Sequence, residues 1–234
     1  AGIIGGAGYT AGELIRLLLN HEEVTIDFVF STSNAGNPVS HVHQDLTGST
    51  NLVFTNTVNT GVDVVFLCLG HGNSKAFLNA NTFENHTKII DLSNDFRLEA
   101  DAVLNGKHFV YGLPELYSDS IKTSNYIANP GCFATAIQLA LLPLAKHELL
   151  QNDVHINATT GATGAGTSLS ATTHFTWRDN NFSYYKPFTH QHLGEIGESL
   201  KSLQSGFSKA LFFMPNRGNF SRGIFATVYT KFMG

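Results

Sequence analysis

Cys132 is the candidate nucleophile of this sequence. It stands in Asn129-Pro130-Gly131-Cys132, directly before a stretch of helical periodicity. A thiol in the first turn of a helix lies at the positive end of the helix dipole, which favours the reactive thiolate form. A buried structural cysteine is the alternative, and this interpretation suits Cys68, which lies in an apolar run.

A thiolate nucleophile needs a partner that carries protons, and two histidines are candidates for this role. His190 and His192 lie close together, and Glu195 follows the second histidine by three residues. If a helix has begun by His192, Glu195 lies on the same face, where it can orient the imidazole and raise its basicity. A surface cluster is an alternative, and a metal site is disfavoured because further ligands are lacking. We therefore predict Cys132, His192 and Glu195 as catalytic residues and no bound metal.

Arg97 is the main candidate for binding an anionic group. It follows a predicted strand, residues 88–92, at the carboxyl edge where open α/β sheets bind ligands. Its guanidinium suits bidentate pairing with a carboxylate or phosphate, whereas a salt bridge to Asp95 or Glu99 is the alternative. Arg217 is a weaker candidate for the same role. The predicted substrate-binding residues are Arg97, His190, Tyr184 and Arg222.

A glycine-rich turn joins the first predicted strand, residues 2–4, to a helix at residues 13–20. Glycines let the main chain approach a phosphate closely, and the helix N-terminus attracts its charge. The spacing departs from the common G-x-G-x-x-G, and a simple tight turn is the alternative. The predicted cofactor-binding residues of this turn are Gly5, Gly6, Ala7, Gly8, Tyr9 and Thr10.

Ser31, Thr32 and Ser33 follow the second predicted strand, residues 25–30. An acidic residue there would bind the ribose 2′-hydroxyl and repel a 2′-phosphate, so hydroxyls without a carboxylate favour NADP. An ordinary polar loop is the alternative. A later glycine-rich loop, with Gly161 and Gly164, is a candidate source of amide donors for an oxyanion or the nicotinamide, or else a flexible connection.

Strands and helices alternate in the first half of the chain, which predicts a Rossmann-type, doubly wound parallel sheet. The pattern changes near residue 129, and we predict a second, α+β catalytic domain. The boundaries are 1–128 for the NADP-binding domain and 129–234 for the catalytic and dimerisation domain. Further predicted strands are 62–69, 154–159, 210–214 and 223–232, and further predicted helices are 73–83, 133–150 with a break or kink at Pro143, and 194–203.

Composition excludes several classes of protein. Fourteen Lys and Arg against eighteen Asp and Glu, without a basic block, disfavour a nucleic-acid partner. The apolar runs are far shorter than the roughly 20 residues of a membrane span. Two cysteines and the lack of a secretory N-terminal pattern predict a cytoplasmic protein. Eighteen phenylalanines leave room for an apolar interface between subunits, and we expect a homo-oligomer, dimer or tetramer.

Taken together, these segments resemble the family of N-acetyl-gamma-glutamyl-phosphate reductases, relatives of aspartate-semialdehyde dehydrogenase. The resemblance runs nearly end to end. The segments that carry it are 8–14 (G-Y-x-G-x-E-L in the family), His71-Gly72, 91–98 (D-L-S-x-D-F-R), 111–116 (Y-G-L-P-E-L), 129–132 (the nucleophile motif), 161–166, 190–192 (H-R-H) and 222–224 (R-G-I). Thr167, Gln191 and Gly194 depart from the family pattern. Family members also continue beyond the last residue, so the second domain is expected to be incomplete.

The resemblance implies NADPH-dependent reduction of N-acetyl-L-glutamyl 5-phosphate to its semialdehyde, a step of arginine biosynthesis. Cys132 would attack the acyl phosphate to form a thioester, which the nicotinamide then reduces. His192, oriented by Glu195, would act as base and then acid, and Arg97 would anchor the substrate carboxylate.

Four alternatives remain open at this stage. Aspartate-semialdehyde dehydrogenase activity and the same reaction on an N-succinyl substrate share the chemistry. A nucleotide-binding regulatory protein without turnover, and a cysteine hydrolase or acyltransferase, belong to other classes. The acyl group, the oligomeric state and the strictness for NADP over NAD are not decided by the residues.

Overall fold

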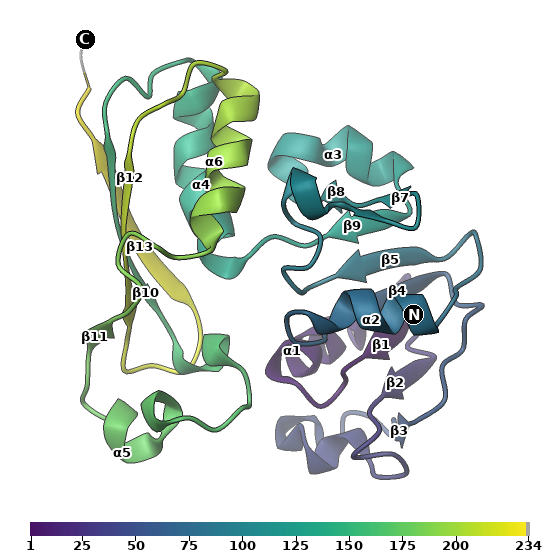
Figure 1. Ribbon diagram of the computed structural model, residues 1–234. Helices are drawn as coiled ribbons and strands as arrows, with labels where there is room; N and C mark the ends of the chain where they lie inside the picture. The colour runs from purple at the N-terminus through teal and green to yellow at the C-terminus, as the bar shows by residue number, and fades with distance from the viewer. Residues whose placement is uncertain (233–234) are drawn as a thin grey trace. The chain divides into compact units, whose positions relative to one another are not determined.

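The computed structural model describes residues 1–232, and Met233 and Gly234 lie outside the described part. The chain forms two compact units that divide between Asn129 and Pro130 (Figure 1). Within residues 1–232, no helix is long and apolar enough to cross a membrane.

The first unit is built on a seven-stranded sheet in the order β3-β2-β1-β4-β5-β9-β8, in which every neighbouring pair is parallel. The chain runs outward from β1 in both directions, which is the doubly wound topology. The strands are β1 (Gly2–Ile4), β2 (Phe28–Phe30), β3 (Phe54–Thr55), β4 (Val64–Leu67), β5 (Lys88–Asp91), β8 (Val110–Tyr111) and β9 (Tyr126–Ala128), with a separate hairpin of β6 (Val103–Leu104) and β7 (Lys107–His108). The helices are α1 (Tyr9–Leu18), α2 (Asn73–Ala80) and α3 (Pro114–Thr123).

Both faces of this sheet are covered, which explains why its central strands are apolar throughout. Consecutive residues of β1 point to opposite faces. Ile3 packs in a cluster with Ile15 of α1, and Ile4 packs in a second cluster that includes Phe96 and, at its border, Phe77 of α2. All of these except Phe77 are fully buried. The two clusters hold the carboxyl ends of β1 and β4 in place.

The second unit contains a four-stranded mixed sheet in the order β11-β12-β10-β13. β10 pairs parallel with β12 and antiparallel with β13. Along β10, residues alternate between buried and exposed, so one face is covered, and Figure 1 shows α4 and α6 beside it. The elements are α4 (Cys132–Lys146), β10 (Val154–Thr160), α5 (Phe175–Arg178), β11 (Ser183–Tyr184), α6 (His192–Leu203), β12 (Leu211–Arg217) and β13 (Ile224–Thr230).

The predicted fold class is confirmed, and the structure corrects several boundaries. α1 begins at Tyr9 rather than at residue 13, because the helical bonding already starts with Gly12 N–H donating to the Gly8 carbonyl at 3.1 Å. Pro143 does not break α4, which ends three residues later at Lys146. The missed elements include the helices α3 and α5 and the two- and three-residue strands β3, β6, β7, β8, β9 and β11. The strands are too short to show a period.

Gly5, at the end of β1, has a backbone conformation that other residues rarely adopt. Its φ is +78°, and a Cβ there would lie 2.5 Å from the carbonyl oxygen of Cys68, the residue that follows β4. Both the positive φ and the missing side chain are therefore required for the turn between β1 and α1.

This constraint predicts the stability of two glycine variants. Gly36 also has a positive φ, +87°, but a Cβ there meets nothing within 4 Å. Gly36→Ala should cost only backbone strain, about 1 kcal/mol. Gly5→Ala adds a clash with main chain and should cost about 3 kcal/mol in total. Urea unfolding of the two variants measures the difference, and equal losses would contradict the steric argument.

Candidate active site

Cys132 is the first residue of α4, and Gly131 is its N-cap. The Gly131 N–H donates to Oε2 of Glu195, on α6, at 2.8 Å. Glu195 is 4% exposed, so this carboxylate lies buried at the positive end of α4. A hydrogen bond to a buried charge is stronger than a neutral one. Glu195 therefore fixes where α4 begins and with it the position of the nucleophile.

The His192 ring lies against Gly131. A Cβ on Gly131 would be 2.4 Å from His192 Nε2 and 2.6 Å from Cε1, so only glycine fits at this position. His192 Nε2 also lies 3.9 Å from Oε1 of Glu195, and His192 is 6% exposed. The structure thus brings the three predicted catalytic residues together around one peptide group. The sequence pattern did not reveal that Glu195 binds the main chain next to the nucleophile as well as facing the histidine.

His190 packs against His192. Its Nδ1 accepts a hydrogen bond from the His192 N–H at 3.2 Å, and the two rings lie 4.6 Å apart at 74°. Burial, with smaller contributions from the charges of His192 and Lys186 and against the opposing charge of Glu195, lowers the pKa of His190 to about 4. His190 is therefore neutral at neutral pH. Because Nδ1 accepts, the proton of the neutral ring is on Nε2.

Tyr185, next to the predicted Tyr184, lies close to the histidines of the site, and the predicted substrate contact of Tyr184 stays a prediction. Tyr184 is 64% exposed. The ring of Tyr185 lies 5.7 Å from that of His190. Burial and the charge of Cys132 raise the pKa of Tyr185 to about 12, against the opposing effect of Arg217 and of a second arginine. Neighbouring residues of a strand point to opposite faces, but a two-residue strand gives no pattern from which to tell which tyrosine points inward.

The second glycine-rich loop is tied to the loop that precedes β13. The Gly161 N–H donates to the Gly223 carbonyl at 3.0 Å, so it is already used and does not face an oxyanion. A Cβ on Gly161 would lie 2.6 Å from the carbonyl oxygen of Ser221 and 2.8 Å from the amide nitrogen of Arg222. Gly161 thus serves close packing. Gly164 and Arg222 are exposed, and their predicted contacts with cofactor and substrate stay predictions.

Arg97, in the first unit, is 7% exposed and holds main-chain carbonyls. Its Nε donates to the Asn129 carbonyl at 2.8 Å and its Nη2 to the Leu92 carbonyl at 2.9 Å. Asp95, a predicted partner, instead accepts from the N–H groups of Gly72 and Lys75 at the start of α2. Arg97 therefore joins the segments that follow β5 and β9, and its predicted contact with substrate stays a prediction.

The turn between β1 and α1 fits a dinucleotide phosphate. It lies where the strand order diverges, between β1 and β4, and no side chain caps α1. A Cβ on Gly8 would meet no atom closer than 3.6 Å, so the main chain is accessible at this N-cap. Ser31 follows β2 and accepts from Asn34 Nδ2 at 3.1 Å, and no carboxylate occurs among residues 31–34.

His43 was not predicted and supports this turn from behind. Its Nε2 lies 2.7 Å from the Gly6 carbonyl oxygen, and a Cβ on Gly12 would be 2.5 Å from its Nδ1. Gly12, in the first turns of α1, therefore leaves the space that the His43 ring occupies. Within residues 1–232, no group of three or more His, Cys, Asp or Glu side chains could hold a metal ion.

The lowered pKa of His190 predicts how stability depends on pH. The unfolded ring takes up a proton near pH 6.5, whereas the folded ring, 4% exposed, does so only near pH 4. The unfolded state thus binds more protons in this window, and stability falls as the pH decreases from 6.5 to 4, by roughly 3 kcal/mol. Chemical denaturation at several pH values should show a smaller decline in His190→Asn. An unchanged decline would contradict a neutral buried His190.

Comparisons with known proteins identify both units of the chain. The family model of the semialdehyde dehydrogenase NAD binding domain matches residues 1–124, and that of the dimerisation domain matches residues 132–234. The aspartate semialdehyde dehydrogenase II of Vibrio cholerae has a similar fold, with a TM-score of 0.70 and 16% identity over 97% of this chain and 72% of that chain.

Relatives of known name are much more similar in sequence. The N-acetyl-gamma-glutamyl-phosphate reductase of Flavobacterium johnsoniae is 69% identical over 98% of this chain and 70% of its own length. The protein of the same name from Christiangramia forsetii is 66% identical over 100% of this chain and 72% of its own length. The chain belongs to the N-acetyl-gamma-glutamyl-phosphate reductase family of the semialdehyde dehydrogenases.

Proposed function

We propose that this protein reduces N-acetyl-L-glutamyl 5-phosphate to N-acetyl-L-glutamate 5-semialdehyde and phosphate, with NADPH as the reductant, in arginine biosynthesis. The proposal rests on the relatives that bear this name at up to 69% identity. The observation that carries the chemistry is the position of Cys132 at the start of α4, with Glu195 on the Gly131 amide and His192 against Gly131.

Cys132 acts as the nucleophile. Its Sγ forms a bond to the acyl carbon, the bond between that carbon and the phosphate oxygen breaks, and phosphate leaves with the bonding electrons. The enzyme then holds a thioester, which splits one hard reaction into two easier ones. The helix N-terminus stabilises the thiolate before the attack.

His192 is the proton carrier. It takes the thiol proton as Cys132 attacks and gives a proton to the alkoxide oxygen of the tetrahedral intermediate that reduction leaves on Cys132. It takes that proton back as the carbonyl re-forms and the Cys132 thiolate departs. Glu195 keeps the imidazole in place, since its Oε2 accepts a hydrogen bond from the Gly131 N–H at 2.8 Å while its Oε1 lies 3.9 Å from His192 Nε2. The same carboxylate thus aligns both the nucleophile and its base.

The turn at residues 5–10 would hold the cofactor phosphates, and Ser31, Thr32 and Ser33 would face the adenosine ribose. When bound, NADPH supplies the hydride that reduces the thioester carbonyl. The match of residues 1–124 to an NAD binding domain supports this assignment and disfavours a cysteine hydrolase, which would have no use for the cofactor. A reducing, cytoplasmic setting belongs to the proposal because Cys132 must be a thiol.

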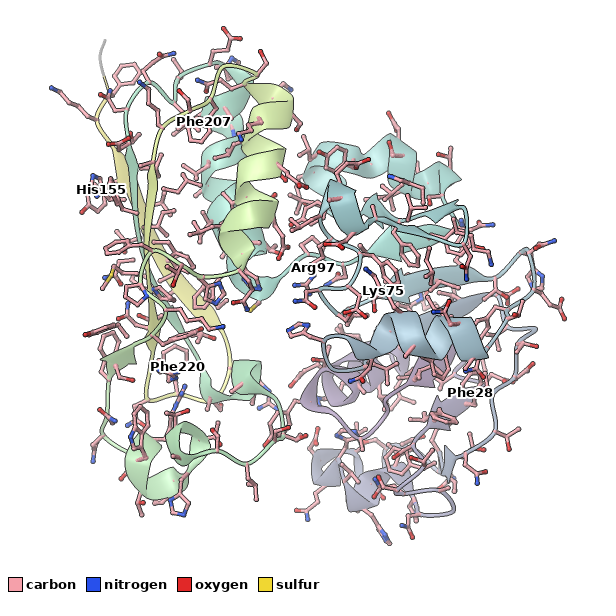
Figure 2. The ribbon with its side chains drawn as sticks, in the orientation of Figure 1. Phe28, Lys75, Arg97, His155, Phe207 and Phe220 are labelled. Atoms are coloured by element: carbon pink, nitrogen blue, oxygen red, sulfur yellow. The ribbon has the colours of Figure 1, made fainter. Side chains whose placement is uncertain are left out.

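The second unit also has a surface suited to a second copy of this chain. On the sheet face away from α4 and α6, the ring of His155 stacks between Phe212 and Tyr229 at 5.2 Å from each. Figure 2 shows His155 pointing away from the helices. Phe212, Phe225 and Tyr229 are 39%, 71% and 60% exposed. Exposed aromatic patches mark interaction sites, and the matching family model is that of a dimerisation domain. We propose that this aromatic face forms the contact between subunits in a homo-oligomer.

Cys132→Ser tests the proposed reaction. The alkoxide of serine is far less available at neutral pH than a thiolate, so turnover should fall by about 10³-fold or more. NADPH binding, measured by fluorescence titration, should be retained. Cys68→Ala is the matched control and should keep its activity. Equal activity of the Cys132 variant and the natural protein would refute the thioester, and activity on aspartyl phosphate alone would refute the substrate.

Phe225→Glu and Tyr229→Glu test the oligomer. Each places a charge in the aromatic face, where burial against a partner would be costly. We expect light scattering to show a shift toward monomer at micromolar concentration. Leu169→Glu, at a leucine that is 99% exposed, is the control and should leave the mass unchanged. A variant mass equal to that of the natural protein would argue against this face.

A further inference from the structure

Two arginines of the second unit meet beside the end of β10. Arg178 is the last residue of α5 and is only 8% exposed. Its Nη2 lies 3.4 Å from the carbonyl oxygen of Thr160. Arg217 is the last residue of β12, and Thr160 is its register partner in the neighbouring strand β10. Figure 1 shows α5 and β11 at the same end of this sheet.

Neither guanidinium is neutralised by the protein. Within residues 1–232, neither Arg178 nor Arg217 forms an ion pair with a carboxylate, and the buried Nε of Arg178 has no hydrogen-bond partner. Burial and the charge of Arg217 both lower the pKa of Arg178. Two like charges at a partly dry site, with a donor unused, are costly unless an anion joins them.

The aromatic surroundings hold Arg217 in one orientation. Its Cζ lies 4.1 Å from the ring centre of Tyr185 and 6.0 Å from that of Trp177. Its Nη1 lies 3.4 Å from the Tyr184 carbonyl oxygen. A guanidinium stacked flat on a ring keeps its N–H groups directed outward at the edges, where they can form bidentate bonds.

Tyr185 connects this pair to the nucleophile. The charge of Cys132 raises the pKa of the Tyr185 hydroxyl, and the charges of both arginines lower it. Its ring also contacts that of His190. The arginine pair therefore lies near the nucleophile within the second unit.

We propose that Arg178 and Arg217, with Tyr185, bind a carboxylate of the substrate and so position the acyl group at Cys132. The inference rests on the function proposed above and adds the residues that recognise the substrate. A rigid cationic site suits a group that stays on the substrate from acyl phosphate to semialdehyde, whereas the phosphate departs halfway. Two sources supply such a carboxylate: the α-carboxylate of the glutamyl group, or the far carboxylate of a dicarboxylic N-acyl group.

Arg217→Gln tests the site in the reverse reaction, in which NADP⁺ oxidises the semialdehyde in the presence of phosphate. Loss of a charge-assisted bidentate contact should raise the KM for the semialdehyde by about 10- to 100-fold. The KM for phosphate and the kcat should change little. Arg217→Lys should recover part of the loss. Lys201→Gln removes the same charge from an exposed position of α6 and is the matched control.

The acyl group of the substrate separates the two sources. With N-acetyl- and N-succinyl-glutamate semialdehyde, an equal rise in KM assigns the arginines to the α-carboxylate, and a rise for the succinyl substrate alone assigns them to the acyl carboxylate. Either result supports the proposal. A rise in the KM for phosphate alone, or no change in any KM, overturns it.

Calorimetric binding of unreactive N-acetyl-L-glutamate and N-succinyl-L-glutamate separates this inference from the proposed function. If the natural protein turns over neither semialdehyde, the proposed function is wrong. Weaker binding of one of these ligands by Arg217→Gln than by Lys201→Gln would still support the proposed carboxylate site. If the natural protein is active and Arg217→Gln matches it in KM and in binding, the inference alone fails. Arg178→Gln is the second variant, with circular dichroism as the check that it folds.

Discussion

The hydrogen bond between the Glu195 carboxylate and the Gly131 amide is the interaction on which the site depends. It joins α6 to the N-terminus of α4, and both helices pack on the same face of the second sheet. A buried carboxylate needs such a donor, because an unpaired charge at 4% exposure would be expensive. The helix N-terminus supplies it and gains a favourable charge in return. The same bond that stabilises the helix pair therefore also places Cys132.

A second constraint is the packing of a histidine ring against a glycine, and it occurs once in each unit. His192 lies on Gly131 beside the nucleophile, and His43 lies on Gly12 behind the phosphate turn. In both places the ring occupies the space of a side chain, so the main chain cannot shift without losing a contact. Rigid support of this kind gives an active site its precision, since small displacements of reacting groups are costly for catalysis.

The sequence alone predicted the elements that have a hydrophobic pattern or a fixed motif. The apolar strand β4, the strand β10 and the glycine turn after β1 follow from burial and from backbone geometry. All three occur, although α1 begins earlier than predicted. The residues it missed belong to short or irregular segments. Arg178 ends a four-residue helix, Tyr185 follows a two-residue strand, and His43 lies between 3-10 turns. Such segments take their direction from tertiary packing, which no local pattern records.

The electrostatic arrangement of the second unit separates proton transfer from anion binding. His190 stays neutral because burial and its charged neighbours disfavour protonation, so it adds no cation next to His192. His192 has the Glu195 carboxylate at 3.9 Å from its Nε2. Arg217 packs over the ring of Tyr185, and within the described residues neither it nor Arg178 forms an ion pair with a carboxylate. On the proposal above, an anionic substrate binds at the arginines, so that His192 and Glu195 remain available for proton exchange while the substrate stays bound.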